Sequence, residues 1–291
     1  MTPFTDNARG ALMMMAAMAG YACNDVLIKF TAQDIGLYQA ILVRGLAATA
    51  LLGVITFWRR EVRLPRAPRD RWLLGCRIVT EIIITILFLT ALLHVPLATV
   101  TAILQFTPLA LTFAAAVLLG ERVGWRRYAA IGIGFFGVIL VVQPGAESFN
   151  VYALYGLAAM VGVVVRDLLT RHMSDAIPSL FVAFSTAAAV TLMAATVCLT
   201  QAWTPMSTAD IGWLLAAAVF ILIGYLSSVT SIRTGDISFV TPFRYTIMLW
   251  AIVLGWVVLD ETPDTLMLIG TAIVTATGVY AIYRETVTAR K

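Results

Sequence analysis

Ten long apolar stretches follow one another along this chain, separated by short polar connections. An α-helix rises about 1.5 Å per residue, so about 20 apolar residues are needed to cross the hydrocarbon core of a bilayer. The stretches lie at roughly 9–29, 37–58, 72–93, 96–119, 125–143, 151–170, 178–200, 210–232, 237–258 and 264–283. They predict an all-α, polytopic membrane protein with ten transmembrane helices.

The overall composition supports the same fold class. Of the 291 residues, 60% are hydrophobic and 12% are charged, and the mean hydropathy is +0.91. Soluble domains have about 45–50% apolar and about 25% charged residues. The first stretch is interpreted as a retained helix, because Asp25 and Lys29 follow it without a small-residue cleavage site. The short connections leave no room for an appended soluble domain.

The charges of the connections are distributed unevenly. The connection at 58–72, WRREVRLPRAPRDRW, carries six arginines, and the connection at 121–127 carries three more. With ten alternating helices these fall on one side, whereas the other side has acidic residues and almost no Lys or Arg. Cytoplasmic loops of membrane proteins are enriched in Lys and Arg. We therefore expect both termini to be cytoplasmic, and we interpret the net charge of +4 as this bias, with no nucleic-acid partner.

The two halves of the chain resemble each other. Residues 97–121 align without gaps on residues 237–261, so that Val100-Thr101 meets Val240-Thr241 and Glu121 meets Glu261. Each half contains five stretches, an odd number, so the second half must enter the membrane upside down. The sequence predicts two inverted five-helix repeats, residues 1–145 and 146–291. Secondary transporters are commonly built this way, with the substrate site near the midplane between the repeats.

The segment GIGFFG at 132–137 has the G-x-G-x-x-G spacing of a dinucleotide-binding turn. That turn needs a preceding strand, a following helix and an acidic residue about 20 positions further on. Gly132, Gly134 and Gly137 instead lie inside one apolar stretch. Small residues in transmembrane helices let neighbouring backbones approach closely, so we expect helix packing here, and no cofactor.

Several polar residues lie deep inside the stretches, where a charge costs roughly 2.5–3.5 kcal/mol on insertion scales. Glu81 is about 14 Å from Trp72, near the midplane. The candidate substrate-binding residues are Arg244, Glu81, Arg77, Arg44, Gln105, Tyr245 and Asn24. The candidates for carrying a coupling proton are Glu81, Asp25 and Asp167. Pro108 removes a backbone hydrogen bond and is expected to kink its helix.

Some of these charges could serve the fold alone. Two pairs could neutralise each other inside the bundle: Arg77 with Glu81, and Asp25 with Arg44. Three residues lie near span ends and could reach the interface with their side chains: Arg166, Asp167 and Lys29. Arg244 has no acidic partner in its own helix, so we favour it as the cation that binds a substrate carboxylate, which its planar fork matches.

The count of deep charges indicates the substrate class. The spans contain four deep arginines and about three deep acidic residues, so the predicted substrate cavity between the repeats would be mildly positive. This suits a small molecule with at least one carboxylate. Glu81 could hold a substrate amine or a coupling proton, and a zwitterion such as an amino acid or its derivative would satisfy both signs.

Two segments carry a resemblance to a known family: PLALTFAAAVLLGERVGWRRYAAIGIGFFGVILVV (108–142) and WAIVLGWVVLDETPDTLMLIGTAIVTATGVYAIY (250–283). In each, an acidic residue closes one helix and a glycine-containing helix follows. With LVRGLAA (42–48) and YACNDVLIKF (21–30), they make the chain resemble ten-helix, EamA-type members of the drug/metabolite transporter superfamily. The resemblance implies a multi-pass protein of the bacterial inner membrane that works by alternating access. It also implies substrates such as amino acids, S-adenosylmethionine or riboflavin.

Other classes fit less well. An integral membrane enzyme would need an accessible nucleophile, acid-base group or metal cluster, yet the two histidines, His94 and His172, fall at opposite faces and no Cys/His metal spacing exists. A channel would place its charges as rings. Another organic anion, a vitamin or a drug-like compound remains an alternative substrate. Direction of transport, proton coupling or exchange, and a homodimer stay open.

Overall fold

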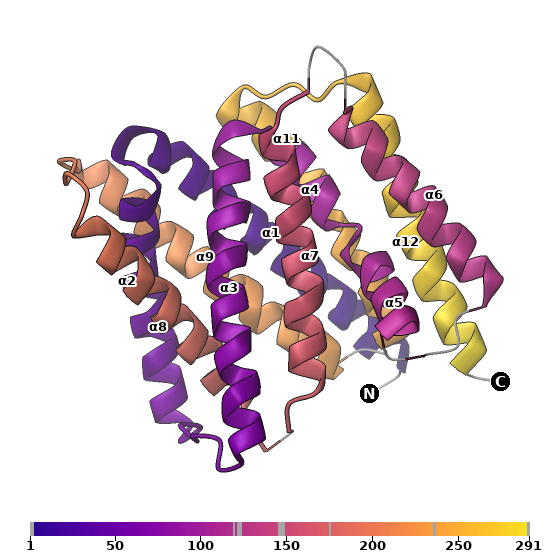
Figure 1. The fold of residues 1–291 in the computed structure, drawn as a ribbon, viewed down its shortest axis with the longest axis horizontal. Helices are drawn as coiled ribbons and strands as arrows, with labels where there is room; N and C mark the ends of the chain where they lie inside the picture. The colour runs from indigo at the N-terminus through magenta and orange to yellow at the C-terminus, as the bar shows by residue number, and fades with distance from the viewer. Residues whose placement is uncertain are drawn as a thin grey trace.

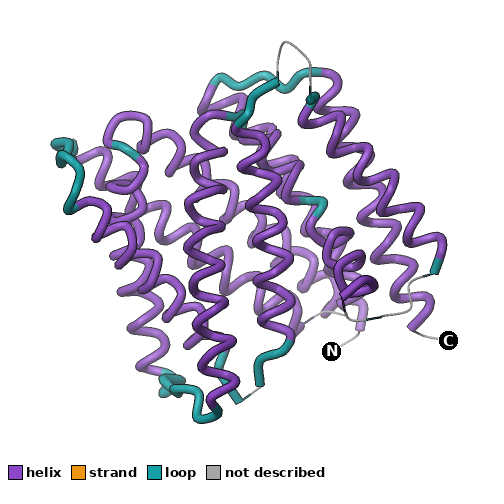
Figure 2. Tube along the Cα trace, viewed as in Figure 1, coloured by secondary structure: helices purple, strands orange, loops and turns teal. Residues whose placement is uncertain are grey.

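The computed structural model of this protein describes residues 3–118, 120, 124–144, 149–174, 176–234 and 237–289. Glu121, which the repeat alignment places opposite Glu261, lies outside these residues. Within them the secondary structure consists of helices joined by loops and turns (Figure 2).

The helices reproduce the predicted stretches closely. Their bounds are α1 (Pro3–Ile35), α2 (Leu37–Trp58), α3 (Pro68–His94), α4 (Leu97–Leu104), α5 (Thr107–Leu118), α6 (Trp125–Val142), α7 (Tyr152–Arg171), α8 (Ser179–Cys198), α9 (Thr208–Thr234), α10 (Ile237–Val240), the 3-10 helix η1 (Thr241–Thr246), α11 (Ile247–Leu259) and α12 (Thr265–Ala289). Ten spans in the described chain are long and apolar enough to cross a membrane, counting α4–α5 as one and η1–α11 as another. The prediction of an all-helical, multi-pass membrane protein with ten spans is confirmed.

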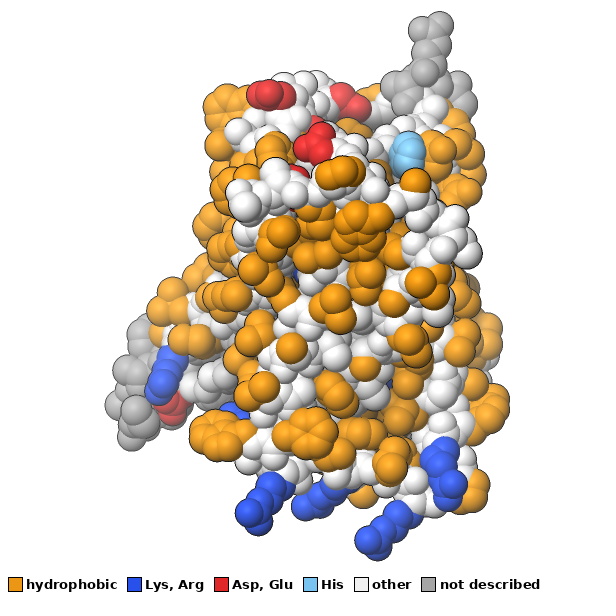
Figure 3. Space-filling view, turned by 90° about the vertical axis from the view of Figure 1, so that its left-hand side faces the viewer, with side chains coloured by type: hydrophobic (Ala, Val, Ile, Leu, Met, Phe, Trp, Pro, Cys, Tyr) orange, Lys and Arg blue, Asp and Glu red, His pale blue; other side chains and the backbone are white. Residues whose placement is uncertain are grey.

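The spans run up and down through a single bundle (Figure 1). The start of α1 and the end of α12 lie at the same end of it, as an even number of spans requires. On the face shown in Figure 3, Lys and Arg side chains gather at that end and Asp and Glu side chains at the other. We call them the basic end and the acidic end. That the basic end faces the cytoplasm stays a prediction.

The main helix contacts pair one half of the chain with the other. The closest packed pairs are α1 with α9, α3 with α7, α2 with α8 and α6 with α12. If every span is replaced by the span at the same position in the other half, the same four pairs result. This reciprocity is what two related five-helix halves would produce, and the inverted arrangement remains our prediction.

Glycines lie at the crossing of α6 and α12. A Cβ atom on Gly137 would lie 2.9 Å from the carbonyl oxygen of Gly270, and a Cβ on Gly270 would lie 2.5 Å from the carbonyl oxygen of Gly137. A Cβ on Gly134 would meet Leu109 at 2.6 Å, whereas one on Gly132 would meet nothing within 4 Å. Two of the three GIGFFG glycines therefore permit close packing, as small residues do in membranes.

Two spans are interrupted at positions that match in the repeat alignment. Between α4 and α5 the helix breaks at Gln105 and Phe106, one turn before Pro108. Pro108 cannot donate to the carbonyl of Leu104, which instead accepts a 2.6 Å hydrogen bond from the Thr107 hydroxyl. In the second half, the corresponding span starts as α10, continues as η1 and becomes regular only in α11. The kink expected at Pro108 is thus a full interruption of the helix.

The bundle surface is strongly apolar. Exposed large side chains occur on nearly every span, among them Leu46, Val54, Val117, Ile133, Val161, Leu192 and Val253. A soluble monomer rarely exposes such continuous apolar surface, and a bilayer covers it. The interior contains one apolar cluster centred on α4, α6 and α7, and a second that joins α1 to α3, α8 and α9.

Candidate functional site

Four charged residues of α3 and α7 lie near one another inside the bundle. We call Arg77, Glu81, Arg166 and Asp167 the central cluster. Glu81 is the fourteenth of the 27 residues of α3. Arg166 contacts Glu81 at 3.4 Å and Asp167 at 2.8 Å, with side-chain exposures of 25%, 21% and 36%. These charges are therefore partly accessible at a depth where lipid would not tolerate them, which indicates that they face an internal space.

Arg77 has neutral hydrogen-bond partners. Its Nε donates to the Thr170 hydroxyl at 3.0 Å and its Nη1 to the Thr186 hydroxyl at 2.7 Å. The ion pair at Glu81 is made with Arg166 of α7. Glu81 therefore interacts with two arginines, because α7 packs along α3 and brings Arg166 to the carboxylate that also attracts Arg77. Arg166 and Asp167 bind partners inside the bundle rather than at its interface.

Tyr21 lies near both the central cluster and the interrupted span of the second half. Its hydroxyl shares a hydrogen bond with Ser228 of α9 and lies within electrostatic range of Arg166 and Arg244. Arg244 itself, in η1, is exposed, and no carboxylate pairs with it within the described residues. Arg244 remains a candidate for binding a substrate anion.

A second polar group lies between α1 and α2. Arg44 Nη1 donates to Asn24 Oδ1 at 3.3 Å, and Asn24 Nδ2 donates to Asp25 Oδ1 at 2.9 Å. The expected pairing of Asp25 with Arg44 is thus mediated by Asn24. Arg44 Nε is buried and has no hydrogen-bond partner in the described structure. A buried donor without a partner costs about 1–3 kcal/mol, so an acceptor on a bound molecule would relieve this cost.

Gln105 and Tyr245, which are partners in the repeat alignment, meet across the two interrupted spans. The Tyr245 hydroxyl reaches the Gln105 carbonyl oxygen at 3.5 Å. The Gln105 side-chain Nε2 is a second buried donor without a partner in the described structure. The Tyr245 ring lies against Gly278 of α12, where any Cβ atom would overlap its hydroxyl.

A further ion pair joins three helices near the acidic end. Lys29 Nζ lies 2.5 Å from Glu261 Oε1 and donates to the Val95 carbonyl at 2.6 Å. Glu261 Oε2 accepts a 2.7 Å hydrogen bond from the backbone N–H of Leu97, at the start of α4. We call this the acidic-end junction. Lys29 is only 4% exposed, so it does not reach the interface as considered above; the carboxylate and the carbonyl bind it inside the protein.

Several members of these groups were not among the sequence candidates. Tyr21, Ser228, Thr170 and Thr186 are ordinary side chains for a transmembrane helix and carry no charge that marks them. Tyr21 lies one helical turn before Asp25, and this i,i+4 spacing is the signal that could have found it. The two threonines could be identified only from the packing of α7 and α8 against α3.

Comparison with known proteins identifies relatives. A family model described as the EamA-like transporter family matches residues 8–143 and again residues 150–284. A pseudopaline exporter of Pseudomonas aeruginosa is 24% identical over 90% of this chain and 91% of its own length. A riboflavin transporter of Vibrio cholerae is 25% identical over 97% of this chain and 96% of its own.

Two further proteins are similar to this chain. An S-adenosylmethionine uptake transporter of Rickettsia conorii is 26% identical over 65% of this chain and 64% of its own length. One solved crystal structure superposes with a TM-score of 0.64 at 15% identity, covering 96% of this chain and 99% of the other. At this identity the superposition shows a shared fold.

Proposed function

Because the chain belongs to the EamA-like transporter family, we propose that it is a secondary active transporter of a small polar metabolite that bears a carboxylate. The substrate would be an amino acid or an amino-acid derivative of the S-adenosylmethionine kind. Transport would occur by alternating access, across the inner membrane of a bacterium. The family and the names of the relatives indicate a transporter rather than an enzyme.

The observation that carries this proposal is the central cluster. Four ionisable side chains lie around Glu81, at the middle of α3, bridge two helices from different halves of the chain and keep 21–36% exposure in the three whose ion pairs are described. Substrate sites of secondary transporters lie near the midplane, at the interface of the repeats, beside interrupted helices. The central cluster, Tyr21 and the interruptions at Gln105 and η1 are all elements of such a site.

The donors of the central cluster and of the neighbouring polar groups favour an anionic ligand. Within the described residues, the hydrogen bonds of Arg77 go to hydroxyls, Arg244 has no carboxylate partner, and Arg44 Nε and Gln105 Nε2 are buried without acceptors. A carboxylate accepts several such donors at once. Glu81 and Asp167 would then face the substrate amine. S-adenosylmethionine carries both groups, which is why we favour this class over riboflavin, a vitamin without a carboxylate.

The acidic-end junction supports an alternating-access mechanism. It joins α1, α4 and the end of α11, that is, helices of both halves, at the end opposite the chain termini. We propose that this contact closes the acidic end in the conformation described here and separates when that end opens. Glu81, Asp25 and Asp167 are our candidates for taking up a coupling proton.

Counterflow in proteoliposomes tests the transport proposal. Vesicles containing the purified protein and loaded with an unlabelled metabolite should accumulate the same labelled metabolite only when it is a substrate. The panel would contain S-adenosylmethionine, amino acids, dicarboxylates and riboflavin. Arg77→Gln and Glu81→Gln should reduce counterflow at least tenfold, whereas Arg63→Gln, in the exposed connection after α2, should not.

Two outcomes would overturn the proposal. Riboflavin as the one accepted compound would show that the vitamin alternative is right and the carboxylate is not required. Counterflow that is unchanged in both Arg77→Gln and Glu81→Gln would show that the central cluster is only structural.

A further inference from the structure

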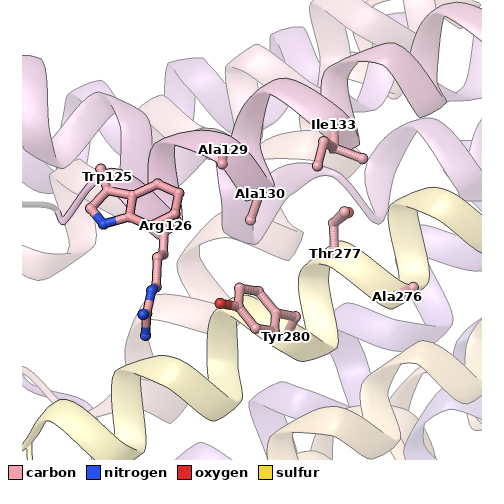
Figure 4. A pocket seen from close by; sticks show the side chains of 8 residues that line it. All are labelled: Trp125, Arg126, Ala129, Ala130, Ile133, Ala276, Thr277 and Tyr280. Atoms are coloured by element: carbon pink, nitrogen blue, oxygen red, sulfur yellow. The ribbon is translucent and has the colours of Figure 1, made fainter.

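A cavity of about 370 Å³ lies outside the central cluster, between α6 and α12. Its lining comes from one side of each helix: Trp125, Arg126, Ala129, Ala130, Ile133, Ala276, Thr277 and Tyr280 (Figure 4). None of these residues belongs to the groups that we assign to the substrate. The cavity therefore needs an explanation of its own, and its size is within the range of about 300–1,000 Å³ that small-molecule sites occupy.

The part of the cavity away from Arg126 is apolar and lies at the outer surface of the bundle. Ala129, Ala130 and Ala276 leave the space that larger side chains would fill, and Ile133, which is 54% exposed, ends it. From Trp125 to Ile133 the cavity follows α6 for eight residues, about 12 Å at 1.5 Å per residue. A groove of this length, parallel to a transmembrane helix, fits an extended hydrocarbon chain.

The other end of the cavity is polar. Arg126 extends from α6 toward α12, and the Tyr280 hydroxyl points back toward it from α12 (Figure 4). The Arg126 guanidinium lies 5.5 Å from the centre of the Trp125 ring, within cation–π distance. Trp125 is 74% exposed and Tyr280 is 42% exposed. Trp, Tyr and Arg at the end of a span are the residues expected at the headgroup level.

From this combination we infer that the cavity binds an anionic glycerophospholipid of the phosphatidylglycerol kind. The phosphate contacts Arg126 and the Tyr280 hydroxyl, the glycerol region lies beside Trp125, and one acyl chain occupies the groove of small residues up to Ile133. The Arg126 end of the cavity lies at the start of α6, toward the basic end of the bundle (Figure 1), where arginines of the connections add to the attraction for negative headgroups. A water-soluble metabolite would leave the alanine-lined part of the groove unmatched.

Native mass spectrometry of the full-length protein in detergent tests this inference, with phosphatidylglycerol and phosphatidylcholine of the same acyl chains as probes. Phosphatidylglycerol should remain bound at lower lipid concentration than phosphatidylcholine. Arg126→Gln should weaken its retention roughly fivefold, the effect of one basic residue near an anionic surface. Ala276→Leu, which leaves the charges intact and fills the groove, should weaken the retention of both lipids.

Arg127→Gln is the matched control, because Arg127 is the next residue of α6 and does not line the cavity. Its retention of phosphatidylglycerol should equal that of the wild type. Equal losses in Arg126→Gln and Arg127→Gln would show a general surface attraction and overturn the inference. So would a cross-linked dimer, in solution and in vesicles, whose contact covers Ala129 and Ala276, because a second copy would then occupy the groove. All variants are first compared with wild type for their melting temperature.

Discussion

Arg166 binds two carboxylates at once, and this double contact determines how substitutions in the central cluster should behave. Glu81 and Asp167 lie at 3.4 Å and 2.8 Å from it. Removing one partner of a fully buried ion pair costs about 3–5 kcal/mol. The central cluster is about a fifth to a third exposed, so water reduces this penalty, and the loss of a single partner should be smaller.

A double-mutant cycle at Glu81 and Arg166 separates the structural role of the pair from its role in transport. Glu81→Gln should lower the free energy of unfolding by about 1–2 kcal/mol, and Arg166→Gln by more, because it leaves two carboxylates without a cation. The double variant should regain part of this stability. Counterflow should be lost in all three variants, measured beside denaturant unfolding in detergent. Recovery of counterflow in the double variant would mean that the pair only supports the fold.

Lys29 is the most deeply buried charge for which an ion pair is described, and Glu261 is its carboxylate partner. Lys29→Met keeps the length of the side chain and removes the charge, which leaves Glu261 uncompensated. We expect the acidic end to open more often. Thr101 lies one turn after Leu97 in α4, and its hydroxyl donates a hydrogen bond to the Leu97 carbonyl oxygen. A cysteine at this position, Thr101→Cys, should then react faster with a membrane-impermeant maleimide added on the side of the acidic end. Cys23, Cys76 and Cys198 would be replaced by Ser.

Asp264→Asn is the control for this experiment. Asp264 also lies at the acidic end and accepts hydrogen bonds from Gln143 and from the backbone N–H of Met267, but it does not contact Lys29. It should leave the labelling rate of Thr101→Cys unchanged. If both variants raise the rate equally, the acidic-end junction has no specific role in closure.

At the scale of helices, the fold depends on how closely pairs of spans can approach. The α6–α12 crossing brings the backbones of Gly137 and Gly270 together. In membranes such packing supplies much of the association energy, because lipid chains are as apolar as leucine and no hydrophobic drive remains. Interrupted helices have a different effect: where the helix breaks, backbone groups and side chains lose their partners within the helix and can bind other groups inside the bundle.

Two substitutions within the same motif test the packing at this crossing. Gly137→Ala would place its Cβ 2.9 Å from the Gly270 carbonyl oxygen and should destabilise the protein by about 1–3 kcal/mol, the usual cost of overpacking. Gly132→Ala meets nothing within 4 Å and should be neutral or slightly stabilising, since Ala favours helix by about 1 kcal/mol over Gly. Thermal unfolding in detergent measures both. Equal destabilisation would show that the crossing does not decide the effect.

At the scale of the whole molecule, the asymmetry of charge between the two ends predicts the orientation of the protein. The bundle gathers Lys and Arg at one end and acidic residues at the other on the face shown in Figure 3. The described ends of α1 and α12 both lie at the basic end (Figure 1). Positive residues remain on the cytoplasmic side of an inner membrane.

Fusions of reporter proteins test this orientation. Green fluorescent protein at the C-terminus should fluoresce, since it folds in the cytoplasm. Alkaline phosphatase fused after residue 203, in the connection between α8 and α9 at the acidic end, should be active, since it needs the periplasm. The reverse pattern would invert the orientation and with it the assignment of which end the acidic-end junction closes.

The sequence by itself determined the number of spans, their approximate bounds and the membrane class, because hydropathy and length are properties of contiguous residues. It also indicated the charge asymmetry, the family and a kink near Pro108, which the structure shows as an interruption of the helix. Tertiary structure decided which charges meet. Arg166 joins Arg77 beside Glu81, Asn24 lies between Asp25 and Arg44, and Lys29 pairs with Glu261 of the other half. Ion pairing depends on which helix faces pack together, and the helical period places residues on a face without naming the neighbour.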